Sequence, residues 1–131
     1  MAKYLLDTCV CISMFRNEGN VRETIRKVGI EDCYISEITV AELYFGLAKS
    51  TDKKRKLEDI KEVQRLFRVI PAYSSFKEYG EIRHSLEHTG QRVDQFGLLI
   101  GATAIHHQMT LVTSNLKHFE RIEGLTIENW K

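Results

Sequence analysis

The sequence predicts an α/β fold, specifically an α/β/α sandwich around a central, mostly parallel sheet. Short apolar runs alternate along the chain with segments whose apolar residues recur at helical spacing. The connections between these segments are short, and the chain contains only one proline. Strands that alternate with helices favour a parallel sheet that is covered by helices on both faces.

Five short stretches have the length and composition of strands. The run KYLLD at 3–7 is apolar with a charge at each end, which is typical of a buried strand that stops at Asp7. Pro71 ends another strand, because proline lacks the amide proton that a sheet requires. The expected strands cover residues 3–7, 32–36, 68–73, 109–114 and 125–130.

Six stretches are expected to be helical, and several carry start and stop signals. The first opens with Asn20, has Glu23 three residues later and closes on Gly29. Asp52 caps another, so we interpret the following KKRK as a solvated helix start rather than a nucleic-acid contact. Gly90 stops a later one. The expected helices cover residues 20–29, 39–50, 52–67, 74–90, 92–104 and 116–122.

Length and composition indicate one domain, residues 1–131, with a substantial core, since 43% of the residues are hydrophobic. No apolar run approaches the roughly 20 residues of a membrane span, and the first residues lack the layout of a secretory signal. We therefore expect a soluble, cytoplasmic protein with no membrane association. The odd cysteine count and the spacing of Cys9, Cys11 and Cys33 argue for reduced thiols rather than disulfides or a zinc site.

Oxygen-bearing side chains follow two of the expected strands. Asp7 ends the first strand, either as a strand-end cap or turn residue helped by Thr8 or as a functional carboxylate, and Asn115 follows the strand at 109–114. Sites in parallel sheets lie beyond the carboxyl ends of the strands, so both side chains are expected along one edge. Carboxylate and amide oxygens suit a hard cation such as Mg²⁺ or Mn²⁺, which can activate water and stabilise a phosphodiester transition state.

Two further acids each have two interpretations. Glu42 closes the sequence TVAE, in which Thr39 would cap the helix and Glu42 would reach back to its start. Alternatively, Glu42 is a functional acid, because it emerges from a largely apolar helix where a carboxylate is costly without a partner. Asp94 is favoured as the N-cap of the helix at 92–104.

Other catalytic patterns are weak. His84 and His88 have a metal-binding spacing, but HSLEH does not have the H-E-x-x-H order, and a solvated face is the simpler interpretation. His106, His107 and His118 form no pattern with them. The chain has no G-x-S-x-G elbow, P-loop or dinucleotide fingerprint.

Five segments that span nearly the whole chain carry a resemblance to a known family: YLLDT, YISEITVAELYFGLAKS, YGEIRHSLEHTG, LLIGATAIHHQMTLVTSN and HFERIEGLTIENW. In order and spacing they resemble the PIN-domain ribonucleases of the VapC type, which are the toxins of VapBC toxin–antitoxin pairs. The resemblance implies an acidic Mg²⁺ or Mn²⁺ site, endonucleolytic cleavage of RNA, transfer RNA included, and homodimerisation. It also implies inhibition by a cognate VapB antitoxin.

The resemblance also assigns roles to individual residues. Asp7 matches the first acid of the family, Glu42 matches the second, and Asn115 stands where relatives carry aspartate or asparagine. Cys9 replaces a frequent asparagine. The polar positions around the site are Thr8, Ser36, Thr39 and Ser114.

Position 97 departs from the family pattern. The third acid of the family aligns with Gly97, in the first turn of the helix at 92–104. A glycine in a helix costs about 1 kcal/mol relative to alanine, so its presence calls for a reason. Asp94 lies one helical turn earlier, roughly 5 Å along the axis, and is the nearest substitute ligand. A structural alternative is a small-residue stripe of Gly97, Gly101 and Ala104 that lets two helices approach closely.

These observations predict a toxin that is a metal-dependent endoribonuclease, with catalytic positions Asp7, Glu42 and Gly97 and metal ligands Asp7, Glu42 and Asp94. Its activity is expected to be impaired or lost through Gly97, because losing an anionic ligand weakens the metal site. The alternative is an inactive PIN-fold module that dimerises and binds an antitoxin. A phosphoacceptor receiver or aspartyl phosphatase is disfavoured, because DTC lacks the second carboxylate of D-x-D and RVIPAY lacks a phosphoacceptor aspartate. Tyr44, Phe45 and Leu47 are candidates for a dimer surface, although the core is the simpler expectation for them.

Overall fold

A computed structural model of the chain describes residues 2–92 and 94–131 and shows a parallel sheet at its centre. The strand order across the sheet is β3-β2-β1-β4-β5, and every pairing is parallel. The α/β/α sandwich with a parallel sheet is therefore confirmed. The strands are β1 (Tyr4–Leu6), β2 (Cys33–Ser36), β3 (Arg68–Ile70), β4 (Thr110–Val112) and β5 (Ile127–Glu128).

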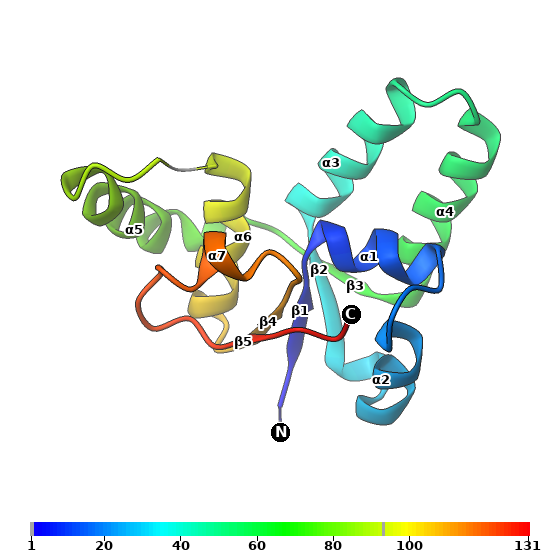
Figure 1. Cartoon of the computed structure of the whole chain (residues 1–131), viewed down its shortest axis with the longest axis horizontal. Coiled ribbons are helices and arrows are strands. Elements are labelled where there is room, and N and C mark those ends of the chain that lie inside the picture. Colours follow the sequence, from blue (N-terminus) through cyan, green and yellow to red (C-terminus); the bar gives the residue numbers. More distant parts are fainter. Residues whose placement is uncertain (1, 93) are drawn as a thin grey trace.

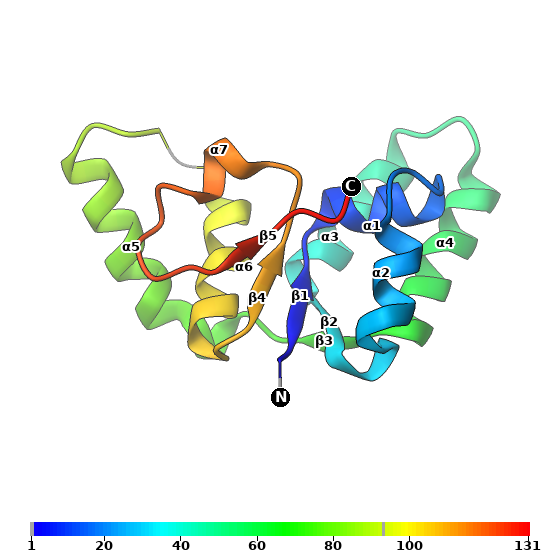
Figure 2. The same cartoon turned by 60° about the horizontal axis from the view of Figure 1, so that its bottom comes forward.

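Helices cover both faces of this sheet. Helices α1 to α4 lie on one side, and α5, α6 and α7 lie on the other (Figures 1 and 2). The helices are α1 (Thr8–Phe15), α2 (Val21–Val28), α3 (Glu37–Ala48), α4 (Lys53–Leu66), α5 (Phe76–His88), α6 (Gln95–His106) and α7 (Leu116–Phe119). Two short 3₁₀ turns, Ile30–Asp32 and Tyr73–Ser75, complete the connections.

The alternation of side chains along β1 builds two separate cores. Leu6 packs into a cluster with Val10 of α1 and Val63 of α4. Its neighbour Leu5 packs on the opposite face, with Leu98 of α6. Successive side chains of a strand point to opposite faces, so one strand anchors both helical layers.

The sheet also fixes where a site can form. β1 pairs with β2 on one side and with β4 on the other, so the order of connection reverses beside β1. The backbone N–H of Asp7 donates to the carbonyl of Val112 at 2.9 Å, which ties the end of β1 to the end of β4. The carboxyl ends of these strands, beside the reversal point, are the expected position of a site in such a sheet.

Helix α1 is not among the helices that the sequence pattern predicts. Residues Thr8–Phe15 form it, and the carboxylate of Asp7 accepts a hydrogen bond from the Thr8 amide at its start. The segment is rich in apolar residues on all sides, so it shows no helical periodicity. The Asp-Thr pair that opens it is a usable helix-start signal.

The surface of α3 carries two large aromatic side chains. Tyr44 and Phe45 are exposed, Phe45 to 67%, so the expectation that they lie in the core is wrong for both. Within the described ranges, no helix has the length and apolar character needed to cross a membrane. Cys9, Cys11 and Cys33 are free thiols, and the last two are buried.

Candidate active site

Asp7 is a buried carboxylate at the junction of β1 and α1, with only 8% of its surface exposed. Its Oδ1 accepts a hydrogen bond from the Thr8 amide at 2.9 Å, and its Oδ2 accepts one from the Thr113 hydroxyl at 2.9 Å. Burial raises the pKa of Asp7 above its ordinary value, and the hydrogen bonds from Thr113 and Thr8 offset part of this rise. The fold therefore holds an anionic group where solvation is poor.

Thr8 connects Glu42 to Asp7, because it forms hydrogen bonds with both side chains. The Thr8 hydroxyl donates to Oε1 of Glu42 at 2.6 Å, and the hydroxyl of Thr39 lies 3.1 Å from that of Thr8. Burial raises the pKa of Glu42, and the negative charges of Asp7 and Asp94 raise it further. Glu42 therefore belongs to the same electrostatic cluster as both aspartates.

The capping-box interpretation of Glu42 is wrong. Helix α3 begins at Glu37, two residues before the expected start, and its N-cap is Ser36. The Ser36 hydroxyl accepts the Ile38 amide at 3.0 Å, so Thr39 is a buried residue of the first turn. Serine fills the cap as well as threonine does, which frees Glu42 to face Thr8.

Asp94 occupies the N-cap position of α6, as the sequence predicted, but its side chain does not cap the helix. Among the described residues it makes no capping hydrogen bond. Its Oδ2 lies 3.1 Å from the point where a Cβ on Gly97 would stand. The carboxylate of Asp94 therefore lies against the space that a side chain at position 97 would enter.

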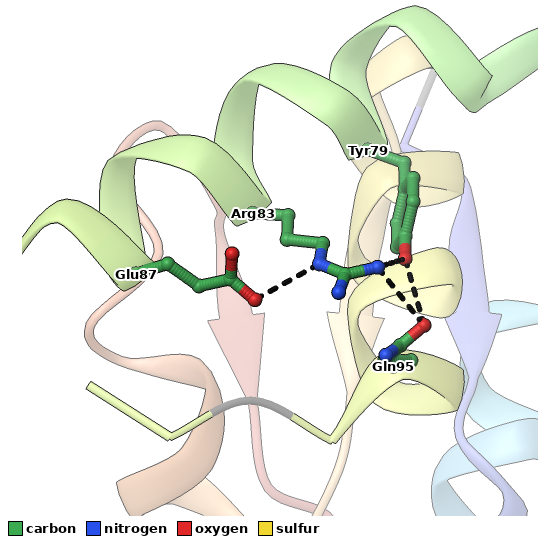
Figure 3. Close-up of polar contacts among 4 residues, drawn as sticks. All are labelled: Tyr79, Arg83, Glu87 and Gln95. Carbon is green, nitrogen blue, oxygen red and sulfur yellow. Dashed lines mark hydrogen bonds and ion pairs between the residues drawn. The ribbon is translucent and has the colours of Figure 1, made fainter. Parts of the chain in front are cut away.

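The first turn of α6 is anchored to α5 by a polar network. The guanidinium of Arg83 donates to the Tyr79 hydroxyl at 2.9 Å and to Oε1 of Gln95 at 3.2 Å, as Figure 3 shows. The Tyr79 hydroxyl donates to the same Gln95 oxygen at 3.0 Å, and Glu87 pairs with Arg83 on its other side. Gln95 directly follows Asp94, so this network also restrains the backbone that carries the carboxylate.

The space above Gly97 is not empty, because the imidazole of His118 enters it from α7. Nε2 of His118 lies 2.5 Å from the position of a Cβ on Gly97, which is closer than a real Cβ tolerates. A glycine is therefore required for this arrangement of the ring. The sequence interpretation missed His118, since it has no partner at a recognisable spacing, and the only available signal was the loss of a side chain at position 97.

The remaining polar residues surround the same point. The hydroxyl of Thr113 also accepts the amide of Asn115 at 3.0 Å, which orders the turn after β4. The Ser114 hydroxyl donates to Sγ of Cys9 at 3.4 Å, and the Cys9 thiol lies 3.5 Å from Oδ2 of Asp7. Thr113 and Ser114 lie behind a cavity of about 260 Å³ that their partners line; its walls are Asp7, Thr8, Cys9, Ile12, Glu42, Asp94, Gly97, Asn115, His118 and Phe119.

The charge balance of this cavity fits a cation. Within residues 2–92 and 94–131, none of the ion pairs involves Asp7, Glu42 or Asp94. Burial raises the pKa values of Asp7 and Glu42, and carboxylates without a cationic partner gain stabilisation from a divalent metal ion. The side chains do not form a ready-made cage, since no three His, Cys, Asp or Glu groups of the described chain already stand in a metal-holding arrangement.

Comparison with known proteins identifies the family. The model of the PIN domain matches residues 4–125. The chain belongs to the PIN-domain family. Among curated proteins, this PIN-domain chain is 33% identical to the ribonuclease VapC2 of Rickettsia felis, with 97% of each chain covered. It is also 33% identical to the tRNA(fMet)-specific endonuclease VapC of Shigella flexneri, with 99% of each covered.

Solved structures agree with this assignment to the VapC type. The PIN domain superposes on a chain of the DNA-bound VapBC structure from Salmonella typhimurium with a TM-score of 0.91 and 31% identity over all of both chains. It matches the promoter-bound VapBC2 structure from Rickettsia felis with a TM-score of 0.90 and 30% identity over 98% of each chain. The acidic cavity thus belongs to a fold whose characterised relatives are named as nucleases.

Proposed function

We propose that this chain is the toxin of a VapBC-type toxin–antitoxin pair and acts as a divalent-metal-dependent endoribonuclease. The observation that carries the proposal is the meeting of Asp7, Glu42 and Asp94 around one cavity at the carboxyl edge of a PIN-domain sheet. We assign catalysis to these acids, because carboxylate oxygens suit a divalent metal ion that can activate water at a phosphodiester.

The residues in and around the cavity have different roles in the proposed reaction. Asp7, Glu42 and Asp94 would hold Mg²⁺ or Mn²⁺, both of which prefer oxygen ligands. Such an ion supplies activation of water and stabilisation of charge on the scissile phosphate. Thr113 and Thr8 keep the carboxylates of Asp7 and Glu42 in place through hydrogen bonds of 2.9 and 2.6 Å. Ser114 and Asn115 order the turn at the mouth of the cavity.

Asp94 substitutes for the acid that the resemblance places at position 97. Its carboxylate approaches the same space from one turn earlier, which supports metal binding in spite of Gly97. Because Asp94 is exposed and at the helix start, it holds an ion less firmly than an acid within α6 would. We therefore propose an enzyme that is active but weaker than one with an acid at position 97, since a ligand displaced by ~1 Å costs about a hundredfold in rate.

The relatives indicate the substrate and the partners. One similar protein is named a tRNA(fMet)-specific endonuclease, and similar structures are complexes of VapB and VapC. For this chain we propose transfer RNA as the substrate, a VapB-type antitoxin as the inhibitor and a homodimer as the working form. Its RNA substrate would place the activity in the cytoplasm.

The direct test is cleavage of total transfer RNA and of purified tRNA(fMet) with Mg²⁺, with Mn²⁺ and with EDTA. The chain should cleave the RNA with either metal and should show no cleavage with EDTA. Asp7→Asn should abolish cleavage. Glu58→Gln on the exposed face of α4 is the matched control and should cleave normally. Absence of cleavage in every form, together with tight binding to an antitoxin, would instead support the inactive binding module.

A further inference from the structure

His118 brings to the cavity a functional group that an aspartate cannot supply. Its ring stands over Gly97, with Nε2 2.5 Å and Cδ2 3.1 Å from the position of an added Cβ. Nε2 is buried, and within the described part of the chain it has no hydrogen-bond partner. A buried polar atom without a partner is costly, so this nitrogen is set up for a group that is not part of the folded chain.

The other ring nitrogen determines where the proton is. Nη2 of Arg121 lies 3.2 Å from Nδ1 of His118. An arginine has donors only, so Nδ1 must act as the acceptor in this contact. The ring proton is therefore on Nε2, and Nε2–H points into the cavity. Burial and the positive charge of Arg121 lower the pKa of His118, and the carboxylates of Asp94 and Asp7 offset part of this shift.

Arg121 is itself held in place. Its Nε donates to the carbonyl of His118 at 2.9 Å, and its Nη1 donates to Oε1 of Gln91 at 3.4 Å. The guanidinium thus bridges the end of α7 to the connection between α5 and α6. Arg121 therefore contacts both the backbone carbonyl and Nδ1 of His118. These two contacts hold the ring and its tautomer in place, so that Nε2–H is preorganised as a hydrogen-bond donor.

We propose that Nε2–H of His118 donates a hydrogen bond to a non-bridging oxygen of the scissile phosphate, which makes His118 a catalytic residue of this enzyme. The proposal rests on the proposed nuclease function. The space beside Gly97, where the resemblance would place an acid, holds the imidazole of His118. A donor at this place stabilises the negative charge that grows on the phosphate during cleavage, which the missing carboxylate would oppose.

The same geometry distinguishes this role from metal ligation. A histidine ligates a metal through a nitrogen lone pair, and the tautomer fixed by Arg121 has a proton on Nε2 instead. The three acids of the cavity provide the oxygen ligands that Mg²⁺ and Mn²⁺ prefer. Substitution of His118 is thus expected to lower kcat without changing the affinity for the metal ion.

Kinetics with two substitutions tests the role. His118→Phe fills the same space without a donor and should lower kcat for RNA cleavage by about 10²-fold, with a much smaller change in KM. His118→Gln retains an N–H donor and should recover a large part of that loss. His88→Phe, on the exposed face of α5, is the matched control and should leave both constants unchanged. Equal activity of His118→Phe and the parent chain would overturn the proposal.

Two measurements that do not depend on activity complete the test. Mn²⁺ affinity, measured by electron paramagnetic resonance, should be the same for His118→Phe and the parent chain, and a tenfold loss would make His118 a ligand instead. The ¹⁵N NMR shifts of the His118 ring in the metal-free protein should report Nε2–H, and Arg121→Ala should release the ring to a mixture of tautomers. A ring protonated at Nδ1 in the parent chain would also overturn the proposal. Failure of every form to cleave RNA would refute the nuclease function itself, whereas cleavage unaffected by His118→Phe would refute this role alone.

Discussion

The hydroxyl of Thr8 lies 2.6 Å from Oε1 of Glu42 and joins the first turn of α1 to the middle of α3. Glu42 is half-buried, and burial and two nearby carboxylates raise its pKa. The Thr8 hydrogen bond offsets part of that rise and holds the Glu42 carboxylate against the first turn of α1, next to Asp7. A threonine next to the first acid thus positions the second.

Replacing Thr8 by valine should therefore impair the site more than the fold. The change preserves shape but leaves Glu42 without its donor, at a cost in unfolding free energy of about 1–3 kcal/mol. Cleavage should fall about tenfold, and Mn²⁺ affinity should fall with it. Thr8→Ser retains the hydroxyl and is the control; a serine variant as weak as the valine variant would show that the methyl group, not the hydrogen bond, matters.

The metal-free protein should lose stability as pH rises through the titration of Asp7. Because burial raises the pKa of Asp7 in the folded state, the folded chain retains its proton at pH values where the unfolded chain has released it. The unfavourable contribution of Asp7 starts near the ordinary pKa of 3.8 and is complete above the raised folded pKa. Asp7→Asn should be more stable than the parent above that window and no more stable below it.

Urea unfolding of both chains from acid to neutral pH checks this, since the difference between them isolates Asp7 from the other carboxylates. Saturating Mn²⁺ should stabilise the parent chain and have little effect on Asp7→Asn. A constant difference in stability at every pH would contradict the buried-carboxylate account.

The sequence was enough to predict the parallel sheet and most of the helices, because their apolar spacing and caps act locally. It was not enough for α1, whose residues are apolar on all sides since the helix is wedged among α2, α3 and the sheet. Asp7 was placed correctly, because a carboxylate directly after a buried strand gains nothing from packing. The role of Glu42 stayed open between helix cap and functional acid, because Thr39 and Ser36 are both competent caps and only the folded chain distinguishes them.

The pairing of Gly97 with His118 could not be predicted from local pattern. These residues are 21 positions apart and meet only because α6 and α7 pack on the same side of the sheet. The glycine was visible as an anomaly of helix propensity, but the ring that requires it was not. The sequence showed that an acid is absent at position 97, but only the structure shows that His118 and Asp94 border the space it would enter.

The network around Arg83 should matter for local order rather than for global stability. Arg83→Leu removes a part-buried hydrogen bond to Tyr79, an exposed one to Gln95 and the exposed ion pair with Glu87. Exposed pairs contribute about 0–1 kcal/mol, so the unfolding free energy should change by less than that. Amide exchange in the first turn of α6 should accelerate. Arg65→Leu, which breaks the remote pair with Glu62 on α4, should leave that turn unaffected.

Adding a single methyl group at position 97 should be unfavourable although it improves helix propensity. Gly97→Ala places a Cβ 2.5 Å from Nε2 of His118, so the ring must shift from its position beside Arg121. Gly80→Ala in α5 meets nothing within 4 Å and should stabilise the chain by up to about 1 kcal/mol. We expect Gly97→Ala to be about 1–3 kcal/mol worse than this control, and Gly97→Ala with His118→Ala to recover most of the difference. Equal stability of the two single variants would mean that the ring is not fixed over Gly97.

An aspartate at position 97 should improve metal binding and cleavage only when the His118 ring is removed. Gly97→Asp alone forces its side chain against His118 and beside the carboxylate of Asp94, so it should gain little cleavage activity and lose stability. Gly97→Asp with His118→Ala supplies an acid within α6 and removes the obstruction, and it should bind Mn²⁺ more tightly than either single variant.

RNA cleavage by the double variant should exceed that of His118→Ala by about tenfold to a hundredfold, because a better-placed ligand improves the position of the metal. Thermal unfolding of all three variants separates folding from chemistry. A folded double variant with no gain in metal affinity over His118→Ala would show that Asp94 already does everything that an acid at position 97 would do.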